Sequence, residues 1–415
     1  MRKSLTIFGI LVVLLAILLV FAEVSVPHLS FKRKPDFCPS EYKQQELLIS
    51  AQKAAKHHKT QWVDSLVNEW YTSARFNGTI LVAERGEILY RGALGYGNFD
   101  TKDTLTLDAP FQLASVSKPI TAIAVLQLFE QGKINLDYAV QYYIPELPHS
   151  NITVRHLLTH RSGISRYMWL GDAHWKDKDG ALSNCDMLDL FAQHGLPLEF
   201  TPGTKFVYNN SNYALLALLV EEITGNDFDD YVRQNIFLPL GMKNSFIYTK
   251  CKQIEIPNKV LGYVSGGKGK FGEVNNDYLN GVTGDKGVYS SVEDLFKLDQ
   301  ALYDETLLKR STIEAAFTPY GHLPNSFKDD YGLGWRIDKY RPNIVYHTGW
   351  WKGFRTMFIR KLDTRHTIIA LNNRENMLPY KLCWEILDQL NNMPDVDPIM
   401  ASPESDPGEE MGGGL

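Results

Sequence analysis

A serine followed three residues later by a lysine could supply a nucleophile and the base that activates it, and this spacing occurs three times in the sequence. The pairs are Ser40 with Lys43, Ser115 with Lys118, and Ser265 with Lys268. A serine hydroxyl is a weak nucleophile until a base takes its proton, and a lysine can serve if partial burial lowers its pKa toward neutrality. Because the spacing recurs, it is uninformative alone, and the surrounding residues must distinguish the pairs.

Only the pair at Ser115 and Lys118 opens an apolar helix. The first pair lies in a polar stretch interrupted by prolines, and the third lies in a glycine-rich loop. From Pro119 to Phe129 the chain is apolar almost all round, which predicts a buried helix that begins near Ser115. Residues three apart share a helix face, so the Lys118 amine is expected beside the Ser115 hydroxyl. From the pair alone, a serine that only caps the helix beside a solvated lysine explains the pattern equally well.

A second group follows the turn at Pro202 and Gly203. Tyr208 and Asn210 stand there, before an apolar run with helical spacing over residues 213–223. Tyr208 could relay a proton, and the Asn210 amide could donate a hydrogen bond to a substrate carbonyl. The same Tyr-x-Asn pattern occurs twice more in the sequence, so this group is also weak in isolation.

A third group follows a strand-like segment at residues 344–346 and precedes Trp350. In chain order, the three groups are Ser115-Val-Ser-Lys118, Tyr208-Asn-Asn210 and His347-Thr-Gly349. This ordered set resembles the three motifs of the serine β-lactamase and penicillin-binding protein superfamily, in its class C-like branch. That branch includes D-stereospecific peptidases and esterases. The connecting segments 152–163 and 284–295 are similar to it as well, and the resemblance spans about residues 60–390.

The resemblance implies a role for each residue of the first two groups. Ser115 would be acylated, and Lys118 and Tyr208 would share the general-base and general-acid work. Asn210 would orient the substrate, and the backbone amides of Ser115 and Trp350 would form the oxyanion hole. The resemblance implies neither a cofactor nor a metal.

The third group departs from the family pattern at its first residue. β-Lactamases and many penicillin-binding proteins carry a lysine where this chain has His347, and the lysine charge meets the substrate carboxylate. A histidine is neutral for much of the time near pH 7, so we expect weaker and pH-dependent attraction. Thr348 would line the strand edge beside the substrate, and a side chain at Gly349 would crowd the substrate against that strand. This pattern favours a peptidase or esterase with slow or absent β-lactam hydrolysis.

The elements that must position these residues follow from hydrophobic patterning. Strand-like runs at 79–83 and 88–90 flank a short connection with a glycine, which predicts a hairpin. Near the other end, strands are predicted at 331–336, 344–348, 355–360 and 367–371, and a helix over 381–390. Helical patterns dominate residues 135–325. This order predicts an α+β fold of the β-lactamase/transpeptidase type, with one antiparallel sheet from both ends of the domain, flanking helices and an inserted helical subdomain.

An uncharged apolar run over residues 4–22 follows Arg2 and Lys3. As a helix rising about 1.5 Å per residue, it would reach roughly 28 Å, close to the thickness of a bilayer core. Residues 1–22 are therefore expected to be a membrane anchor or, because residues 20–22 fit a cleavage site, a signal peptide. In either case the catalytic part is expected outside the cytoplasm, periplasmic or extracellular, or secreted if the segment is cleaved.

The remaining chain divides by composition. Residues 23–59 are expected to form a linker and a leading helix, and residues 60–392 the hydrolase domain. Residues 393–415, rich in proline, glycine and acidic side chains, are expected to be disordered.

The net charge of −5, with lysine and arginine spread along the chain, leaves no basic face for nucleic acid. Four cysteines are too few for a disulfide scaffold, and their pairing stays open.

His156 and His160 stand four residues apart and could hold a metal from one helix face. A third ligand is not evident in the sequence. The alternative is that both histidines pack around a turn that ends at Gly163, and we favour it.

The sequence therefore predicts a serine hydrolase that cleaves an amide or ester through a covalent acyl-enzyme. Its expected substrates are small molecules or short peptides, chiefly a D-Ala-type peptide such as a cell-wall peptide, or a small ester. The alternative is a sensor that is acylated by penicillin or cell-wall peptides, or a catalytically silent binding module. Tyr208 argues for turnover, because a sensor needs no efficient second step.

Overall fold

The structure is a computed structural model that describes residues 39–73, 75–194, 196–252, 258, 260–267, 270–321 and 329–393. The chain divides into two units, Met1–Ala54 with Asp395–Leu415, and Ala55–Pro394. Helix α2 (Pro39–Thr72) contains every described residue of the first unit.

The predicted membrane segment over residues 1–22 and the predicted tail beyond Met393 lie outside the described residues. Across the part of the chain that the structure does describe, no helix is both long and apolar enough to cross a bilayer.

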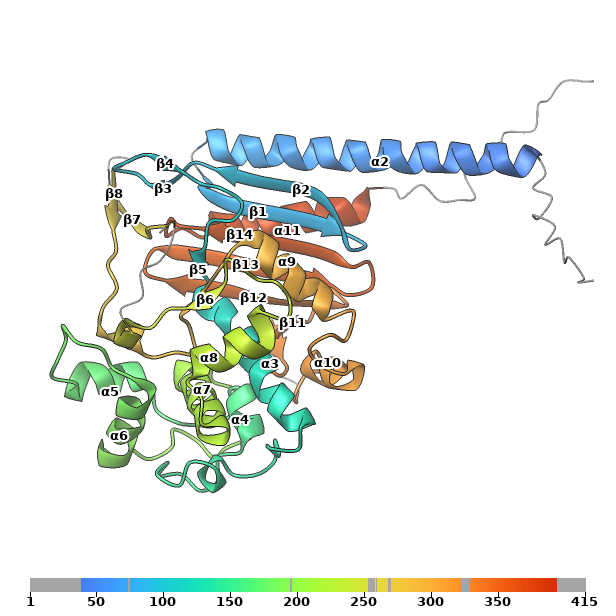
Figure 1. Cartoon of the computed structure of the whole chain (residues 1–415). Coiled ribbons are helices and arrows are strands. Elements are labelled where there is room, and N and C mark those ends of the chain that lie inside the picture. The colour runs from blue at the N-terminus through green and yellow to red at the C-terminus, as the bar shows by residue number, and fades with distance from the viewer. Residues whose placement is uncertain are drawn as a thin grey trace, which may run out of the picture. The chain divides into compact units, whose positions relative to one another are not determined.

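The second unit contains a seven-stranded antiparallel sheet (Figure 1). Its strands are β1 (Gly78–Glu84), β2 (Glu87–Leu94), β10 (Asp329–Tyr331), β11 (Arg336–Asp338), β12 (Ile344–Trp351), β13 (Phe354–Lys361) and β14 (His366–Asn372). The order across the sheet is β10-β11-β12-β13-β14-β1-β2, so that Ile80 near one end of the chain pairs with Ala370 near the other. The predicted α+β fold, with one sheet built from both ends of the domain, is confirmed.

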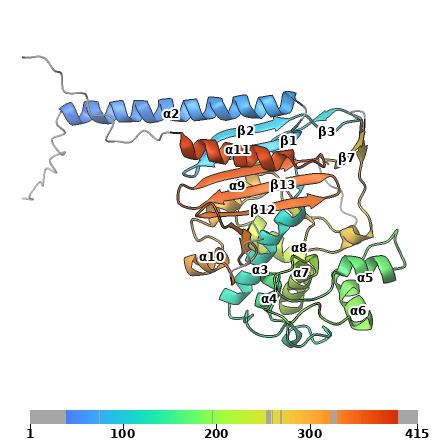
Figure 2. The same ribbon diagram turned by 180° about the vertical axis from the view of Figure 1, so that it is seen from behind.

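Both faces of this sheet are covered, which explains the strand sequences. Leu81 of β1 packs against the core shared with the inserted helices, whereas Ile80 and Val82 pack against α2 and the last helix, α11 (Leu378–Asn392). Figure 2 shows α11 across this second face. Successive strand side chains point to opposite faces, so a strand covered on both sides reads as an unbroken apolar run.

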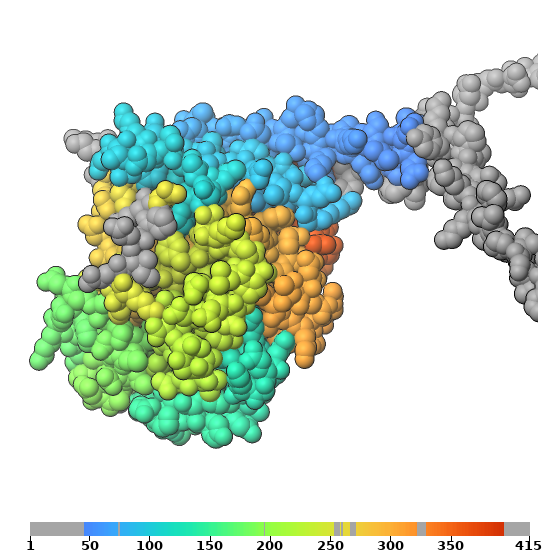
Figure 3. All heavy atoms as spheres, viewed as in Figure 1, coloured from blue at the N-terminus to red at the C-terminus, as the bar shows by residue number. Residues whose placement is uncertain are grey.

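Helices and short strands fill the chain between β2 and β10. The helices are α3 (Ser117–Glu130), α4 (Val154–Leu158), α5 (Tyr167–His174), α6 (Asn184–His194), α7 (Asn210–Thr224), α8 (Phe228–Val232), α9 (Val292–Ala301) and α10 (Arg310–Ala316). Single turns are η1 (Ala114–Val116), η2 (Val140–Tyr142), η3 (Arg233–Phe237), η4 (Lys250–Lys252) and η5 (Tyr278–Gly281). Short strands are β3 (Tyr96–Asn98), β4 (Asp103–Thr104), β5 (Phe111–Gln112), β6 (Phe246–Ile247), β7 (Tyr263–Gly267), β8 (Lys270–Glu273) and β9 (Val288–Ser290). The helices from α4 to α8 lie on the side of the second unit away from β1 and β2 (Figure 1), and Figure 3 shows green to yellow-green atoms of this part of the chain together on the surface.

Most predicted elements are present, but the strand expected at 331–336 is wrong. Tyr331 ends β10 and Arg336 begins β11, and the residues between them turn. Gly334 has a φ of 92°, and a Cβ there would lie 2.5 Å from the Ala122 Cβ of α3. The sequence Tyr331–Arg336 is apolar because this turn packs against a buried helix, not because it is extended.

Candidate active site

Ser115 lies on the turn η1, directly before the buried helix α3. Ala114 has a φ of 51°, a left-handed conformation that is rare for residues with a side chain and strains the backbone next to Ser115. Lys118 Nζ lies 3.0 Å from Ser115 Oγ, and the Lys118 side chain is fully buried. Neither helix start is capped by a side chain. The alternative that Ser115 only caps a helix beside a solvated lysine is therefore wrong.

Lys118 has three hydrogen-bond partners, and none carries a charge. Besides Ser115 Oγ, its Nζ contacts Asn210 Oδ1 at 2.9 Å and the backbone oxygen of Asp285 at 2.8 Å. In the neutral form that a general base requires, the amine has two N–H groups and one lone pair. With both hydrogens donated to these two oxygens, the lone pair would face the Ser115 hydroxyl.

Asn209 fixes the positions of its two neighbours, Tyr208 and Asn210. Its side chain accepts from the Ser211 amide as the N-cap of α7, and its Nδ2 donates to the Ile164 oxygen at 2.6 Å. Asn210, the first residue of α7, consequently reaches Lys118. The cap that orients this motif therefore belongs to the middle residue of Tyr-Asn-Asn.

Tyr208 lies beside the pair without a direct hydrogen bond to it. Lys118 Nζ is 5.0 Å from the centre of the Tyr208 ring. Among the hydrogen bonds of the described residues, none joins the Tyr208 hydroxyl to Ser115. The structure thus brings Tyr208 to the site, at a distance that leaves its proton-relay role a prediction.

The two histidines considered as a metal pair serve different purposes. His156 accepts from the Thr153 amide at 3.2 Å as part of the capping box of α4. His160 lies beyond the end of α4, fully buried, with its ring centre 4.3 Å from that of Tyr208. His160 Nδ1 lies 3.2 Å from the Asn209 amide. The His160 ring therefore packs against the Tyr208 ring, and the two imidazoles do not share one site.

His347 is fully buried and held as a neutral imidazole. Its Nε2 lies 3.1 Å from the Tyr331 hydroxyl, and its Nδ1 lies 2.9 Å from the Thr348 backbone oxygen. Burial, together with the nearby charges of Arg336 and Lys118, holds the pKa of His347 well below its usual range. Since the ring stays neutral across the physiological range, the expected pH-dependent attraction of a carboxylate by His347 has no support in this environment.

Gly349 brings strand β12 against the turn that carries Ser115. A Cβ at Gly349 would lie 2.2 Å from the Leu113 oxygen and 2.1 Å from Thr356 Oγ1. Those two atoms are themselves hydrogen-bonded at 2.6 Å. Our expectation that a side chain here would crowd the substrate is corrected, because it would first collide with the protein. Trp350, the predicted oxyanion-hole residue, follows directly on the same strand.

Arg336 is a functional candidate that we did not predict from the sequence. Its guanidinium carbon lies 5.1 Å from the centre of the Tyr208 ring, and its Nη1 lies 3.4 Å from the Asp329 carboxylate. Its buried Nε has no hydrogen-bond partner among the described residues. Arg336 and Thr348 also line one hollow of about 360 Å³. A positive charge therefore stands beside the predicted site, on the strand that pairs with β12.

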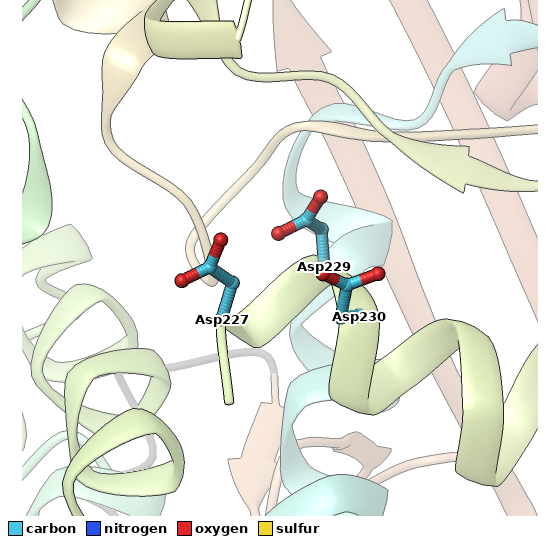
Figure 4. Close-up of side chains that lie close together, drawn as sticks. All are labelled: Asp227, Asp229 and Asp230. Carbon is cyan, nitrogen blue, oxygen red and sulfur yellow. The ribbon is translucent and has the colours of Figure 1, made fainter. Parts of the chain in front are cut away.

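Another hollow lies away from this site. It measures about 530 Å³ and includes Asp227, Asp229, Cys185 and Cys251, but none of the predicted site residues. Figure 4 shows Asp227, Asp229 and Asp230 together at the start of α8. Lys252 Nζ lies 2.7 Å from the Asp227 carboxylate and 2.6 Å from that of Asp229, so an ammonium already pairs with two of the three carboxylates. Cys185, Cys251 and Cys383 are free thiols, and Cys38 lies outside the described residues.

Comparisons with known proteins cover the whole of this site. The family model described as Beta-lactamase matches residues 63–388. Penicillin-binding protein 4* of Bacillus subtilis (strain 168) is 35% identical over 337 residues, 79% of this chain and 74% of that protein. A D-aminopeptidase of Gluconobacter oxydans (strain 621H) is 25% identical over 311 residues, 72% of this chain and 57% of that protein. The crystal structure of a penicillin-binding protein from Bacillus halodurans superposes with a TM-score of 0.68 at 26% identity, covering 80% of this chain and 99% of that one.

Proposed function

The chain belongs to the beta-lactamase family and is a serine hydrolase, and we propose that it cleaves short peptides of the D-Ala type that end in a free carboxylate. The observation that carries the hydrolase chemistry is the position of Lys118, whose Nζ lies 3.0 Å from Ser115 Oγ and within hydrogen-bond distance of the Asn210 and Asp285 oxygens. The family relatives that are named penicillin-binding protein and D-aminopeptidase support a peptide substrate.

The proposed reaction assigns a residue to each step. Lys118 takes the proton as Ser115 Oγ attacks the scissile carbonyl, and an acyl-enzyme forms as the amine leaves. The backbone amides of Ser115 and Trp350 hold the oxyanion, and Asn210 orients the substrate. Tyr208, next to Lys118, passes a proton to the leaving amine. Water then attacks the ester, with Lys118 and Tyr208 acting in the reverse direction.

Arg336 supports a substrate with a carboxylate close to the scissile bond. His347 is neutral, so it cannot supply the charge that the family lysine provides. Arg336 stands beside Tyr208, the residue assigned to the leaving group, and one of its buried donors has no partner among the described residues. A carboxylate on the leaving group would satisfy that donor and pair with the guanidinium charge.

Mass spectrometry of the full-length protein in detergent tests this proposal. The protein is incubated with benzylpenicillin, with a fluorophosphonate, or with an N-acylated D-Ala-D-Ala peptide, and then digested. We expect an adduct on Ser115 with the first two reagents and release of D-alanine from the peptide. A stable penicillin adduct without peptide turnover would identify the alternative, an acylated sensor. No adduct on Ser115 with any reagent would exclude both.

Replacing Arg336 with methionine is expected to lower kcat/KM for the D-Ala-D-Ala peptide about 10- to 100-fold, the effect of one charge-assisted hydrogen bond. The same peptide with an amidated C-terminus lacks the carboxylate, so its slower hydrolysis is expected to change little. The matched control is Arg341→Met, because Arg341 also pairs with a carboxylate, that of Asp338 on β11 at 3.4 Å. Equal losses on both peptides would show that Arg336 does not read the carboxylate.

Hydrolysis of the cephalosporin nitrocefin is expected to be slow or absent, at least about tenfold below the peptide in kcat/KM, because the neutral His347 replaces a charged group. The measurement is the absorbance change of nitrocefin under the conditions of the peptide assay. Rapid cephalosporin turnover by the purified protein would contradict this expectation.

We further propose that the catalytic unit works outside the cytoplasm, attached to a membrane. The apolar run over residues 4–22, which lies outside the described residues, supports this location through its length and basic flank. Fractionation of cells that produce the protein tests it, followed by protease treatment of intact cells or spheroplasts. The proposal fails if the protein sediments with neither membranes nor the exported fraction.

A further inference from the structure

A buried ion pair includes Asp285, the residue whose backbone oxygen contacts Lys118. Lys286 Nζ is 3.3 Å from Asp285 Oδ1, and these side chains are 3% and 0% exposed. Tyr167, on α5, joins the two: its hydroxyl accepts from Lys286 Nζ at 2.7 Å and donates to Asp285 Oδ2 at 3.1 Å. Burial, followed by the Asp285 charge, raises the pKa of Tyr167 well above its usual value, so the phenol remains a donor. All three groups are thus satisfied within one closed network.

The backbone of the same segment holds helix α3. The Asp285 oxygen accepts from Lys118 Nζ at 2.8 Å, and the preceding Gly284 oxygen accepts from Thr121 Oγ1 at 2.7 Å. Gly284 has a φ of 91°, and a Cβ on it would lie 2.4 Å from the Tyr213 oxygen. Two successive carbonyls are therefore directed at successive turns of α3 by a backbone shape that glycine permits.

Lys286 also reaches the other side of the site. Its Nζ lies 5.0 Å from the centre of the Trp351 ring, next in sequence to Trp350 of the predicted oxyanion hole. Burying an ion pair is often no more stabilising than burying apolar side chains of the same size. The desolvation cost of the Asp285–Lys286 pair is more readily understood if the pair positions a neighbouring group. That group is the Asp285 backbone carbonyl, which contacts Lys118.

We infer that Asp285, Lys286 and Tyr167 form a positioning network, which fixes the Asp285 carbonyl so that the lone pair of Lys118 points at Ser115. The inference rests on the proposed function, in which Lys118 is the base for acylation. Asn210 and the Asp285 carbonyl accept the two amine hydrogens, so a shift of either one turns the lone pair away from the serine. Lys286 contacts no reacting atom and is a positioning residue, while Lys118 remains the catalytic one.

The charges around Lys286 come from several elements. Asp285 adjoins it in the chain, Lys118 faces it from α3, and Tyr167 faces it from α5. Asp277, before η5, also acts on it, and Asp277 pairs with Lys352 at 2.5 Å. Burial is the main cause that lowers the pKa of Lys286, and the Lys118 charge adds to it, while Asp285 opposes it. A charge on Lys118 therefore disfavours the charge on Lys286.

The test compares full-length variants for their rate of acylation by penicillin and for peptide kcat and KM. Lys286→Met is expected to lower the acylation rate and kcat roughly 10- to 100-fold, as a misplaced reacting group does, with little change in KM. It also removes a positive charge near Lys118 and leaves Asp285 unpaired, so protonation of Lys118 becomes easier. The acid limb, which is the decline of the acylation rate as the pH falls, is therefore expected to move to higher pH. A purely structural loss of folded enzyme would lower the rate without moving this limb.

Two further variants keep the inference falsifiable. Asp285→Asn with Lys286→Met removes both charges and leaves no unpaired ion, so it is expected to fold, to acylate slowly, and to keep the wild-type acid limb. Tyr167→Phe retains the ion pair and loses only the hydroxyl, and it is expected to slow acylation about 3- to 10-fold. If both charge variants fail to fold, the acylation rate of Tyr167→Phe tests the inference.

The control is Lys59→Met, because Lys59 is another buried lysine, 2.8 Å from the Glu84 carboxylate and remote from the site residues in sequence and contacts. It is expected to leave kcat and the acid limb unchanged. Folded network variants that acylate at the wild-type rate with a wild-type acid limb would overturn the inference. A wild-type protein that is not acylated at all would instead defeat the proposed function, so the two failures are distinguishable.

Discussion

The Ser115→Ala variant is expected to lose peptide turnover and covalent labelling together, with kcat/KM reduced by more than about 10⁴-fold, as for other serine nucleophiles. Lys118 would then have no hydroxyl to activate, while Asn210 and the Asp285 carbonyl still hold its amine. The fold is expected to persist, because among the described residues the Ser115 side chain is hydrogen-bonded only to Lys118. The measurements are peptide kinetics, mass spectrometry after fluorophosphonate treatment, and thermal unfolding.

The other serine–lysine pairs provide the control. Ser265 has the same spacing to a lysine, but it lies exposed on β7, so Ser265→Ala is expected to keep full activity and labelling. Lys118→Met is expected to lose nearly as much activity as Ser115→Ala while Ser115 remains present. A Ser115→Ala protein that still forms a penicillin adduct would place the nucleophile elsewhere and contradict the assignment.

The elements around the nucleophile could be predicted because their signals are local. An apolar run with no polar face predicts a buried helix, and 11 of the 14 residues of α3 are buried. The hairpin of β1 and β2 follows from two strand-like runs with a short glycine-containing connection. The order of strands and helices along the chain, together with three spaced motifs, was then sufficient for the fold class.

What could not be predicted depends on close approach between distant segments. The Asp285 carbonyl contacts Lys118 across 167 residues, through a backbone atom that every residue type possesses. Arg336 resembles any other surface arginine in the sequence, and only the pairing of β11 with β12 brings it to Tyr208. The need for glycine at position 349 could not be predicted correctly either, because the atoms that exclude a Cβ there belong to two distant residues, Leu113 and Thr356.

We propose that Arg336 compensates for the histidine in the third motif. His347 replaces a family lysine, and burial with two cationic neighbours keeps it neutral. Its Nε2 instead lies within hydrogen-bond distance of the Tyr331 hydroxyl, so His347 connects β12 with β10. The positive charge beside the leaving-group side of the site comes from Arg336, one strand away. The motif alone predicts weak carboxylate recognition, whereas we propose that Arg336 on the neighbouring strand supplies it.

Gly349→Ala is expected to lower kcat about 10²- to 10³-fold, a loss typical for a displaced oxyanion donor, and to destabilise the fold by about 1–3 kcal/mol through overpacking. The new Cβ would intrude between Leu113 and Thr356, whose hydrogen bond joins β13 to the turn before Ser115. To make room, β12 must retreat from η1, and Trp350 moves with the strand while Ser115 stays on η1. The two amides of the oxyanion hole would thus separate, although neither residue has been changed.

Gly272→Ala is the matched control for this effect, because a Cβ at Gly272 on β8 meets nothing within 4 Å. It is expected to leave kcat and the melting temperature close to those of the wild type. In Gly349→Ala, the oxyanion-hole argument requires that kcat fall further than the folded fraction does, and that the rate of acylation by penicillin fall in parallel. If activity per folded molecule were unchanged, Gly349 would not be needed to position an oxyanion donor at Trp350, and the proposed role of Gly349 would be wrong.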